Sequence, residues 1–556
     1  MGKYVRWQAA VALFGILLLG ALLSYTAYTF PTKVIPARGG TYSEGIAGNP
    51  QYLNPLLSHY NDIDRDLVAL LFNGLTTLDE RGVVVPDLAD HWEVSADNLS
   101  YTFYLRHNVR WSDGAPFNAD DVVFTVSIMQ SDDFQWAPWL STLWKSVNVA
   151  KIDDYTVSFT LSQPFAPFLD YTTIGLLPSH LWSRYPVAEL TSAQLNTRPV
   201  GTGPWQLTQI DADHVRLEPN PFFDGPLPFL SGIEFRFYPD TRRVVSAFGR
   251  GEINAIAHLY PDDVKSVLTE PHLNLFSSTL PGYALIYLNL NSSNVPFFQD
   301  KAVRQALLQG LNRQQLIDEA LQGQGLIAHS PIQPGNWAYD ANVRQYSFDP
   351  EAARKLLSDA GWVDSDGDGI RDKDGKPLRF VFLTSDASDQ MALGRLVTQQ
   401  WKEIGVDVEA QTTSFAGLAA DYLGTHNFDA ALVTWELSGD PDPYPLWHST
   451  EIDGGQNYAR WNNRQADEAM EAARRTNDQA QRIELYRQFQ AVFTDEVPAL
   501  LLYHPVYTFG VEDKVRSVTI GKLNRAADRF RSVSEWYIVT QRVSAGEAAR
   551  LDKSRP

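Results

Sequence analysis

The sequence predicts an α/β fold with several lobes, and two observations support this prediction. The chain has 556 residues, which at roughly 150 residues per domain suggests about three or four domain-sized units. Short runs with the apolar pattern of strands alternate with segments of helical periodicity along the whole chain, without an internal repeat. Such interleaving is typical of sheets covered by helices.

The composition is that of an ordinary globular protein, and it excludes several kinds of site. Hydrophobic residues make up 44% and charged residues 20%. A formal net charge of −20 argues against nucleic-acid binding, because phosphate contacts need a basic face. The absence of cysteine excludes disulfides, zinc–thiolate sites, iron–sulfur clusters, thiol nucleophiles and lipid attachment through an N-terminal cysteine.

Residues 1–30 predict an export signal or a membrane anchor. Lys3 and Arg6 precede an apolar run over 9–23, and a Tyr/Thr-rich extension reaches Phe30. The whole run approaches the ~20 residues that span a bilayer. The positive end stays cytoplasmic, so the rest lies on the outer face of the cytoplasmic membrane, periplasmic or extracellular. Because the cleavage sites are poor, we expect an uncleaved anchor; a cleaved signal peptide and a buried core helix are the alternatives.

Individual elements can be placed by their capping residues and apolar patterns. An Asn or Asp whose side chain accepts a backbone N–H begins a helix, and proline is favoured at the first helical position. Clustered or alternating apolar residues indicate strands. Helices are expected after Asn118, Asp300 and Asp349, a helix or helix pair over about 467–493, and strands over 101–105, 155–161 and 233–238.

No catalytic motif is visible in the sequence. None of the 11 histidines lies in an H-E-x-x-H pair, and there is no G-x-S-x-G elbow for an acyl-transfer serine. Gly201 and Gly203 begin a G-x-G, but Pro204 and Trp205 follow, so we interpret this as a turn and not as a dinucleotide site. Two distant carboxylates leave no signature, so an exported hydrolase with a carboxylate pair in a cleft stays an alternative to a binding protein.

One run of residues is specific. The segment LSYTFYLR at 99–106 leads into VRWSDG at 109–114 and FNADDV at 117–122. This pattern indicates a strand, a turn at Asp113-Gly114 and a helix capped by Asn118 with acidic residues in its first turn. Further motifs follow in order: NP at 49–50 with LNP at 53–55, PVGTGP at 199–204, PF at 296–297 with Asp300 and VRQA at 303–306, and NY at 457–458 with Pro498.

Together these motifs resemble the family 5 extracellular solute-binding proteins, the oligopeptide and dipeptide receptors of ABC importers, from about residue 40 to 537. The resemblance implies a two-lobed periplasmic-binding-protein-like fold of type II, with an extra subdomain in lobe I and two strands crossing between the lobes. The lobes would close on ligand by hinge motion. The expected division is 1–30 anchor or signal, 31–39 tether, 40–76, 198–287 and 505–542 lobe I, 77–197 extra subdomain, 288–504 lobe II, and 543–556 polar tail.

The function implied by the resemblance is capture of a peptide outside the cell and its delivery to an ABC permease with its ATPase subunits. Such a receptor is not an enzyme and needs no catalytic cofactor. We expect a monomer that attaches to the membrane through its N-terminal helix and binds no nucleic acid. Because the same fold accepts other ligands, an oligosaccharide or a nickel chelate is the alternative solute.

Candidate ligand contacts lie at the end of an apolar strand and in the turn that follows. Strand ends that face a cleft are where α/β proteins place ligand contacts. In peptide-binding relatives an Asp three residues after Trp435 binds the ligand's ammonium, but here this position is Ser438, which leaves Glu436 or Asp440 to supply the charge. For every candidate, packing in the core or forming a turn is the competing interpretation. The candidate ligand-binding residues are Trp435, Ser438, Asp440, Tyr283 and Tyr287.

An acidic loop after residue 363 predicts a structural calcium ion. Aspartates occupy positions 1, 3, 5 and 9 of a calcium-binding loop, and glycine occupies position 6. Position 12 is Gly375 in place of the usual bidentate glutamate, so an acidic turn without an ion is the alternative. Carboxylates this close repel one another unless a cation offsets their charge. The expected ligands are Asp364, Asp366, Asp368, the carbonyl of Ile370, and Asp372.

Overall fold

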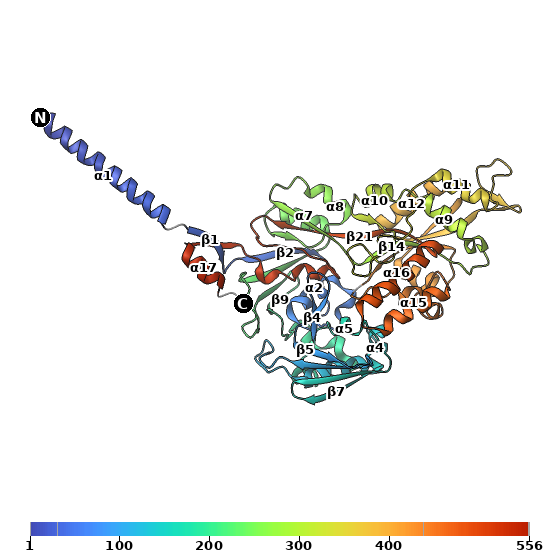
Figure 1. The fold of residues 1–556 in the computed structure, drawn as a ribbon, viewed down its shortest axis with the longest axis horizontal. Helices are drawn as coiled ribbons and strands as arrows, with labels where there is room; N and C mark the ends of the chain where they lie inside the picture. The colour runs from blue at the N-terminus through green and yellow to red at the C-terminus, as the bar shows by residue number, and fades with distance from the viewer. Residues whose placement is uncertain (1, 30–31, 438, 554–556) are drawn as a thin grey trace.

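The computed structural model describes residues 2–29, 32–437 and 439–553. It begins with a long helix, α1 (Gly2–Thr29), that projects away from the body of the protein (Figure 1). The segment Trp7–Tyr25 has a mean hydropathy of 2.0 and is long enough to cross a membrane, and none of it is buried against the protein. A transmembrane anchor and an export signal share these properties.

The two ends of the body are joined by a small sheet. Strand β1 (Thr32–Ala37) pairs antiparallel with β22 (Val539–Ser544), and the helix α17 (Ala545–Lys553) follows. The segments expected as an irregular tether and a polar tail therefore contain regular structure. The two strands could not be recognised in the sequence because each is short and its partner lies at the other end of the chain.

A twelve-stranded mixed sheet runs through the body with the strand order β19-β18-β20-β14-β21-β12-β2-β11-β10-β9, and β13 and β15 pair with β21 off this path. Strand β21 (Ala499–Glu512) is the link, because its first half pairs with β14 and β15 and its second half with β12 and β13. The other strands are β2 (Thr41–Ala47), β9 (Trp205–Ile210), β10 (His214–Pro219), β11 (Gly232–Tyr238), β12 (Ala255–Ile256), β13 (Leu273–Thr279), β14 (Gly282–Leu288), β15 (Gly325–Ile327), β18 (Arg379–Ser385), β19 (Asp407–Thr413) and β20 (Ala430–Glu436).

Separate hydrophobic cores lie on the two sides of this link. One large core contains residues from 42 to 257 and from 507 to 536, and we call this part the first lobe. Two adjoining cores contain residues from 283 to 503, the second lobe. The chain crosses between β13 and β14, and again within β21. Strand β14, which we expected to end lobe I at residue 287, pairs with β20 in the second lobe. It is apolar throughout because it is a central strand covered on both faces.

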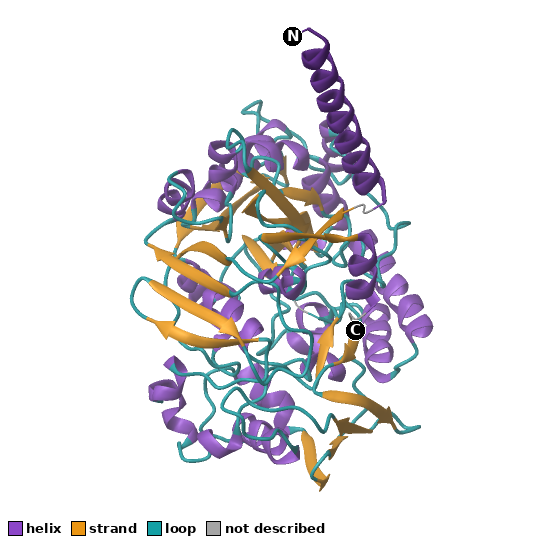
Figure 2. Cartoon of the chain, turned by 90° about the vertical axis from the view of Figure 1, so that its left-hand side faces the viewer, coloured by secondary structure: helices purple, strands orange, loops and turns teal. Residues whose placement is uncertain are grey.

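Helices surround these sheets on the outside of the body, and α1 stands apart from them (Figure 2). The first lobe has α2 (Asp62–Leu71), α3 (Ala119–Gln130), α4 (Pro138–Lys145), α5 (Phe168–Tyr171), α6 (Ser179–Trp182), α7 (Thr241–Gly249) and α8 (Pro261–Val267). The second has α9 (Lys301–Gln309), α10 (Arg313–Ala320), α11 (Pro350–Asp359), α12 (Ser388–Glu403), α13 (Phe415–Gly417), α14 (Tyr444–Trp447), α15 (Arg464–Arg475) and α16 (Gln479–Glu496).

The sequence-based elements are confirmed. Asn118, Asp300 and Asp349 cap α3, α9 and α11, and each side chain accepts a backbone N–H of the first turn. The helical region near 467–493 is the pair α15 and α16. The three expected strands are β6 (Ser100–Leu105), β8 (Thr156–Leu161) and β11.

A four-stranded antiparallel sheet in the first lobe contains the most specific motif. Its order is β5-β6-β8-β7, with β5 (Ala89–Val94) and β7 (Val147–Asp153) at the edges. After β6, the indole N–H of Trp111 donates to Asp121 at 3.2 Å, and Asp121 also accepts the backbone N–H of Ser179 at 2.8 Å. Asn118 and Asp121 form a capping box at the start of α3. Trp111, Asn118 and Asp121 therefore hold the fold together and do not line the cavity between the lobes.

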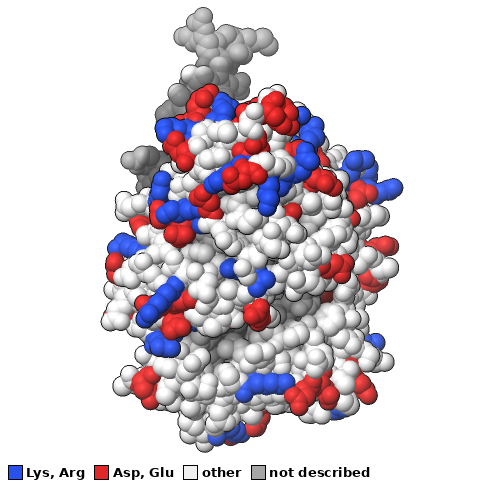
Figure 3. All heavy atoms as spheres, turned by 90° about the vertical axis from the view of Figure 1, so that its right-hand side faces the viewer, with Lys and Arg blue, Asp and Glu red and all other residues white. Residues whose placement is uncertain are grey.

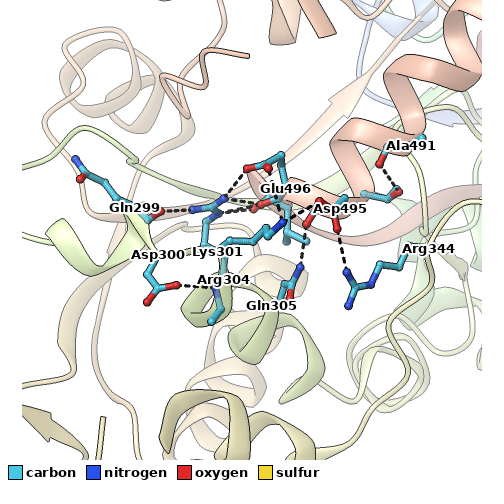
Figure 4. Close-up of polar contacts among 12 residues, drawn as sticks. Gln299, Asp300, Lys301, Arg304, Gln305, Arg344, Ala491, Asp495 and Glu496 are labelled. Atoms are coloured by element: carbon cyan, nitrogen blue, oxygen red, sulfur yellow. Dashed lines mark hydrogen bonds and ion pairs between the residues drawn. The ribbon is translucent and has the colours of Figure 1, made fainter. Parts of the chain in front are cut away.

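A second motif residue, Arg304, fixes the point where β21 begins (Figure 4). Its buried guanidinium donates to the carbonyls of Glu496 at 2.6 Å and Val497 at 3.0 Å. Val497 ends α16 in the left-handed conformation with φ 49°, and β21 starts two residues later. Lys301 and Arg344 both pair with Asp495 in the last turn of α16, where basic groups are favourable. The motif thus connects α9 to the strand that links the lobes.

Candidate functional site

A cavity of about 600 Å³ lies between the two lobes. The first lobe contributes residues of α2, α4 and α5 together with the C-terminal segment 524–534, and the second lobe contributes 281–283, 331–336 and 437–446. A volume of this size falls in the range of roughly 300–1,000 Å³ that is typical of small-molecule sites. The cavity is therefore the candidate binding site.

The lobes are in contact beyond the crossing strands, so the structure is a closed one. The backbone N–H of Ala166 in the first lobe donates to the carbonyl of Arg474 in the second at 2.7 Å. Asn477 of the second lobe donates to Asn98 and to the hydroxyl of Tyr101, each at 3.0 Å. These contacts would break on hinge opening, which would expose the cavity to solvent.

Two aspartates of the turn after β20 line the cavity, and each is paired with an arginine. Arg482 donates two hydrogen bonds of 2.6 Å to Asp440, and both side chains are only 8% exposed. Arg474 pairs with Asp442 at 2.7 Å and lies 3.7 Å above the ring of Tyr444. Burial alone would lower the pKa of Arg482, but the Asp440 carboxylate outweighs this effect and raises the pKa above its usual value. This guanidinium therefore stays charged. Both carboxylates are satisfied by the protein itself.

A third carboxylate, that of Asp170 in α5, faces this turn from the first lobe. An added Cβ at Gly439 would lie 2.8 Å from Asp170 Oδ1, and the φ of +69° also disfavours other residues there. Among the described residues, no side chain lies within hydrogen-bonding distance of the Asp170 carboxylate. Burial and the nearby Asp440 carboxylate raise the pKa of Asp170 to about 7, against the opposing effect of Arg482.

Aromatic side chains form another wall of the cavity. Trp139 is 50% exposed, and its ring contacts the rings of His59 and Tyr171 with centroids 5.5 and 6.4 Å apart. Burial, together with the neighbouring Arg525 and Arg65, lowers the pKa of His59 to about 4. His59 is therefore neutral at pH 7. The cavity thus combines an aromatic wall with charged groups of both signs.

The outer surface next to the cleft has a different character. On the face drawn in Figure 3, acidic and basic side chains are interspersed and do not gather into a patch of one sign. This face therefore has no patch of one sign that would steer a charged ligand to the cleft. Selection of a ligand by charge therefore depends on the groups inside the cavity.

The structure places the five predicted ligand-binding residues in different surroundings. Tyr283 and Asp440 line the cavity. Trp435 is partly buried and donates from its indole N–H to the hydroxyl of Tyr287 at 2.8 Å, and neither residue is part of the cavity wall. Ser438 lies outside the described residues.

Sequence reasoning missed other residues of the cavity wall. Asp170, Tyr171 and Trp139 lie in short helices of the first lobe, and His59 and Arg65 lie in and just before α2. These residues are far from Trp435 in sequence, and no motif surrounds them. Residues 77–197 are expected to form an extra subdomain of lobe I, and nothing in the sequence places them at the cleft.

The acidic loop lies between α11 and β18 of the second lobe and is not part of the cavity wall. Three exposed carboxylates, those of Asp364, Asp366 and Asp368, have oxygen atoms within 4.8 Å of one another. The fourth, Asp372, instead accepts hydrogen bonds from the hydroxyl and the backbone N–H of Ser365, at 2.8 and 3.0 Å. Calcium binding by this loop stays a prediction.

Comparisons with known proteins agree with this architecture. Residues 83–457 match the model of the bacterial extracellular solute-binding proteins, family 5 middle region. The oligopeptide-binding protein AppA of Bacillus subtilis is 32% identical over 481 residues, covering 84% of this chain and 87% of the relative. These matches confirm the resemblance that the sequence motifs indicate.

Solved structures give the same result for the fold. AppA of Bacillus subtilis in complex with a nonapeptide has a TM-score of 0.71 at 27% identity, covering 91% of this chain and 100% of that one. NikZ of Campylobacter jejuni in complex with Ni(L-His) has a TM-score of 0.72 at 24% identity, covering 89% and 99%, and this likeness concerns the fold alone. The expected periplasmic-binding-protein fold is confirmed. The chain therefore belongs to family 5 of the bacterial extracellular solute-binding proteins, the non-enzymatic receptors of ABC importers.

Proposed function

We propose that this receptor captures short peptides between its two lobes and delivers them to the membrane permease of an ABC importer. The observation that carries the proposal is the cavity of about 600 Å³ between the lobes, which combines aromatic walls with charges of both signs. A peptide has an apolar or aromatic body and charged ends, so this combination suits it. The relative AppA, an oligopeptide-binding protein, supports the same ligand class.

Membrane attachment is a separate part of the proposal. Helix α1 ends at Thr29 and β1 begins at Thr32, where it is already paired with β22. An uncleaved α1 would therefore hold the body close to the outer face of the cytoplasmic membrane, within reach of a permease and its ATPase subunits. We propose that the receptor works as a monomer in this position.

Isothermal titration calorimetry with a random tetrapeptide library tests the ligand class. We expect saturable binding and a release of heat, and chromatography of the recovered library should show no hydrolysis. The negative change in heat capacity that accompanies apolar burial should also be present. The absence of binding at millimolar peptide, together with tight binding of a nickel chelate or an oligosaccharide, would contradict the peptide proposal.

A further inference from the structure

We propose that Asp170 of the first lobe binds the cationic group of the ligand, so that the amino end of a captured peptide lies beside α5. This inference rests on the proposed function and adds to it the residue that selects for a positive charge. It also moves that role away from the turn after β20, where sequence reasoning placed it.

The charges at this end of the cavity do not balance. Three carboxylates, of Asp170, Asp440 and Asp442, lie near two guanidinium groups, of Arg474 and Arg482. Each guanidinium is already paired with one aspartate of the turn. One carboxylate is therefore left without a counter-ion among the described residues, and it is the one that lines the cavity from the first lobe.

Four of the five N–H groups of Arg482 donate to partners other than Asp170. Its two terminal nitrogens donate to Asp440, one of them also donates to the hydroxyl of Tyr486, and its Nε donates to the carbonyl of Ala473 at 3.1 Å. Arg482 therefore attracts Asp170 only through space. The Asp170 carboxylate is partly buried and accepts no side-chain hydrogen bond from the described residues, so an ammonium group in the cavity would supply both the opposite charge and the hydrogen-bond donors.

The position of Asp170 also links cation binding to closure. Its carboxylate packs against Gly439 of the second lobe, since a Cβ added at Gly439 would lie only 2.8 Å from Asp170 Oδ1. When the lobes separate, Asp170 moves away from Asp440 and into water. In the closed state a cation at Asp170 lies in a less solvated place and feels Asp440 more strongly than Arg482, and a ligand that binds the closed state more tightly shifts the equilibrium towards closure.

Calorimetry on the full-length protein in detergent tests the proposal with two probes. The first is a random tetrapeptide library without Lys, Arg and His, and the second is the same library with acetylated N-termini. We expect the wild type to bind the first at least ~10-fold more tightly, about the loss of one charge-assisted hydrogen bond. Asp170→Asn should weaken binding of the first library by a similar factor and should not discriminate between the two. The exposed Asp386→Asn is the matched control and should behave like the wild type.

The outcomes separate this inference from the proposed function. If the wild type binds both libraries equally, or if Asp170→Asn keeps the full preference for the unmodified library, Asp170 does not bind the cation although peptides are still captured. If the wild type binds neither library, the peptide proposal and this inference both fail. If Asp170→Asn unfolds, Asp170→Ser replaces it, and binding of the unmodified and acetylated libraries is compared for this variant and the wild type. A wild type that prefers the unmodified library by less than threefold overturns the inference.

Discussion

Single buried charges hold the first lobe together. Arg529 is 1% exposed and donates to Asp66 at 2.7 and 2.6 Å, and it also pairs with Glu44. This network joins the C-terminal segment to α2 and β2, which are more than 400 residues away in the chain. A buried pair of this kind contributes little net stability, but removing one partner leaves an uncompensated charge.

Arg529→Met should therefore lower the free energy of unfolding by ~3–5 kcal/mol, the usual cost of breaking a buried ion pair. Urea unfolding followed by circular dichroism measures this value. Arg464, which is exposed and pairs with Glu468 on α15, is the matched control, because solvent screens its charge. An equal effect of Arg464→Met and Arg529→Met would contradict the role given to the buried network.

Protonation of Asp170 gives a second prediction for a single residue. Burial holds the pKa of Asp170 at about 7 in the folded state, above the ordinary value of 3.8 for an aspartate. Between these pH values the folded protein holds a proton that the unfolded chain has released, so stability falls as the pH rises towards about 7. The charged groups that set this pKa are Asp440 and Arg482. Without ligand, the melting temperature of the wild type relative to Asp170→Asn should fall as the pH rises from ~4 to ~7 and should change little above this range. A difference in melting temperature between the wild type and Asp170→Asn that does not change with pH would contradict this prediction.

At the scale of elements, local signals in the sequence were sufficient for capped helices and insufficient for the cavity. Asn118, Asp300 and Asp349 mark helix starts because a cap depends only on neighbouring backbone groups. Strand β1 was missed because its partner β22 is about 500 residues away. The apolar run of β14 was visible, but the sequence does not state which lobe a central strand joins.

The turn between β20 and α14 is an element whose backbone the closed state constrains. Gly439 has φ +69°, and an added Cβ would meet Asp170 at 2.8 Å. Gly439→Ala should weaken ligand binding at least ~5-fold, since the left-handed conformation costs a non-glycine residue roughly 1–2 kcal/mol. Calorimetry measures the loss. The control Gly251→Ala has a similar φ of +72° but open space around it, so it should affect stability and not binding. Identical binding by Gly439→Ala and wild type would show that closure does not need this approach.

The acidic loop between α11 and β18 gives a prediction for a metal site. If Asp364, Asp366 and Asp368 hold calcium, the ion must stabilise the folded state by RT ln(1 + [L]/Kd). Melting should move upward in millimolar calcium, and Asp366→Ala should remove this shift, whereas Asp386→Ala should keep it. Equal melting temperatures in calcium and in chelator would leave only an acidic turn.

At the scale of the whole molecule, the family motifs predicted two lobes, a cleft between them and an apolar N-terminal helix. They did so although Trp111, Asp121 and Arg304 stabilise the fold and do not line the cavity. The cavity wall was not predictable in the same way. It brings together side chains from α2, α4, α5, two loops of the second lobe and the C-terminal segment, and only folding brings them together.

The central claim is that the cleft captures a peptide, and native mass spectrometry of the protein purified from its own membrane tests this most directly. The account predicts a bound species that leaves on activation and fragments as one or more short peptides with unmodified amino termini. A bound nickel chelate or oligosaccharide, or a protein that remains without peptide after incubation with a peptide library, would contradict it.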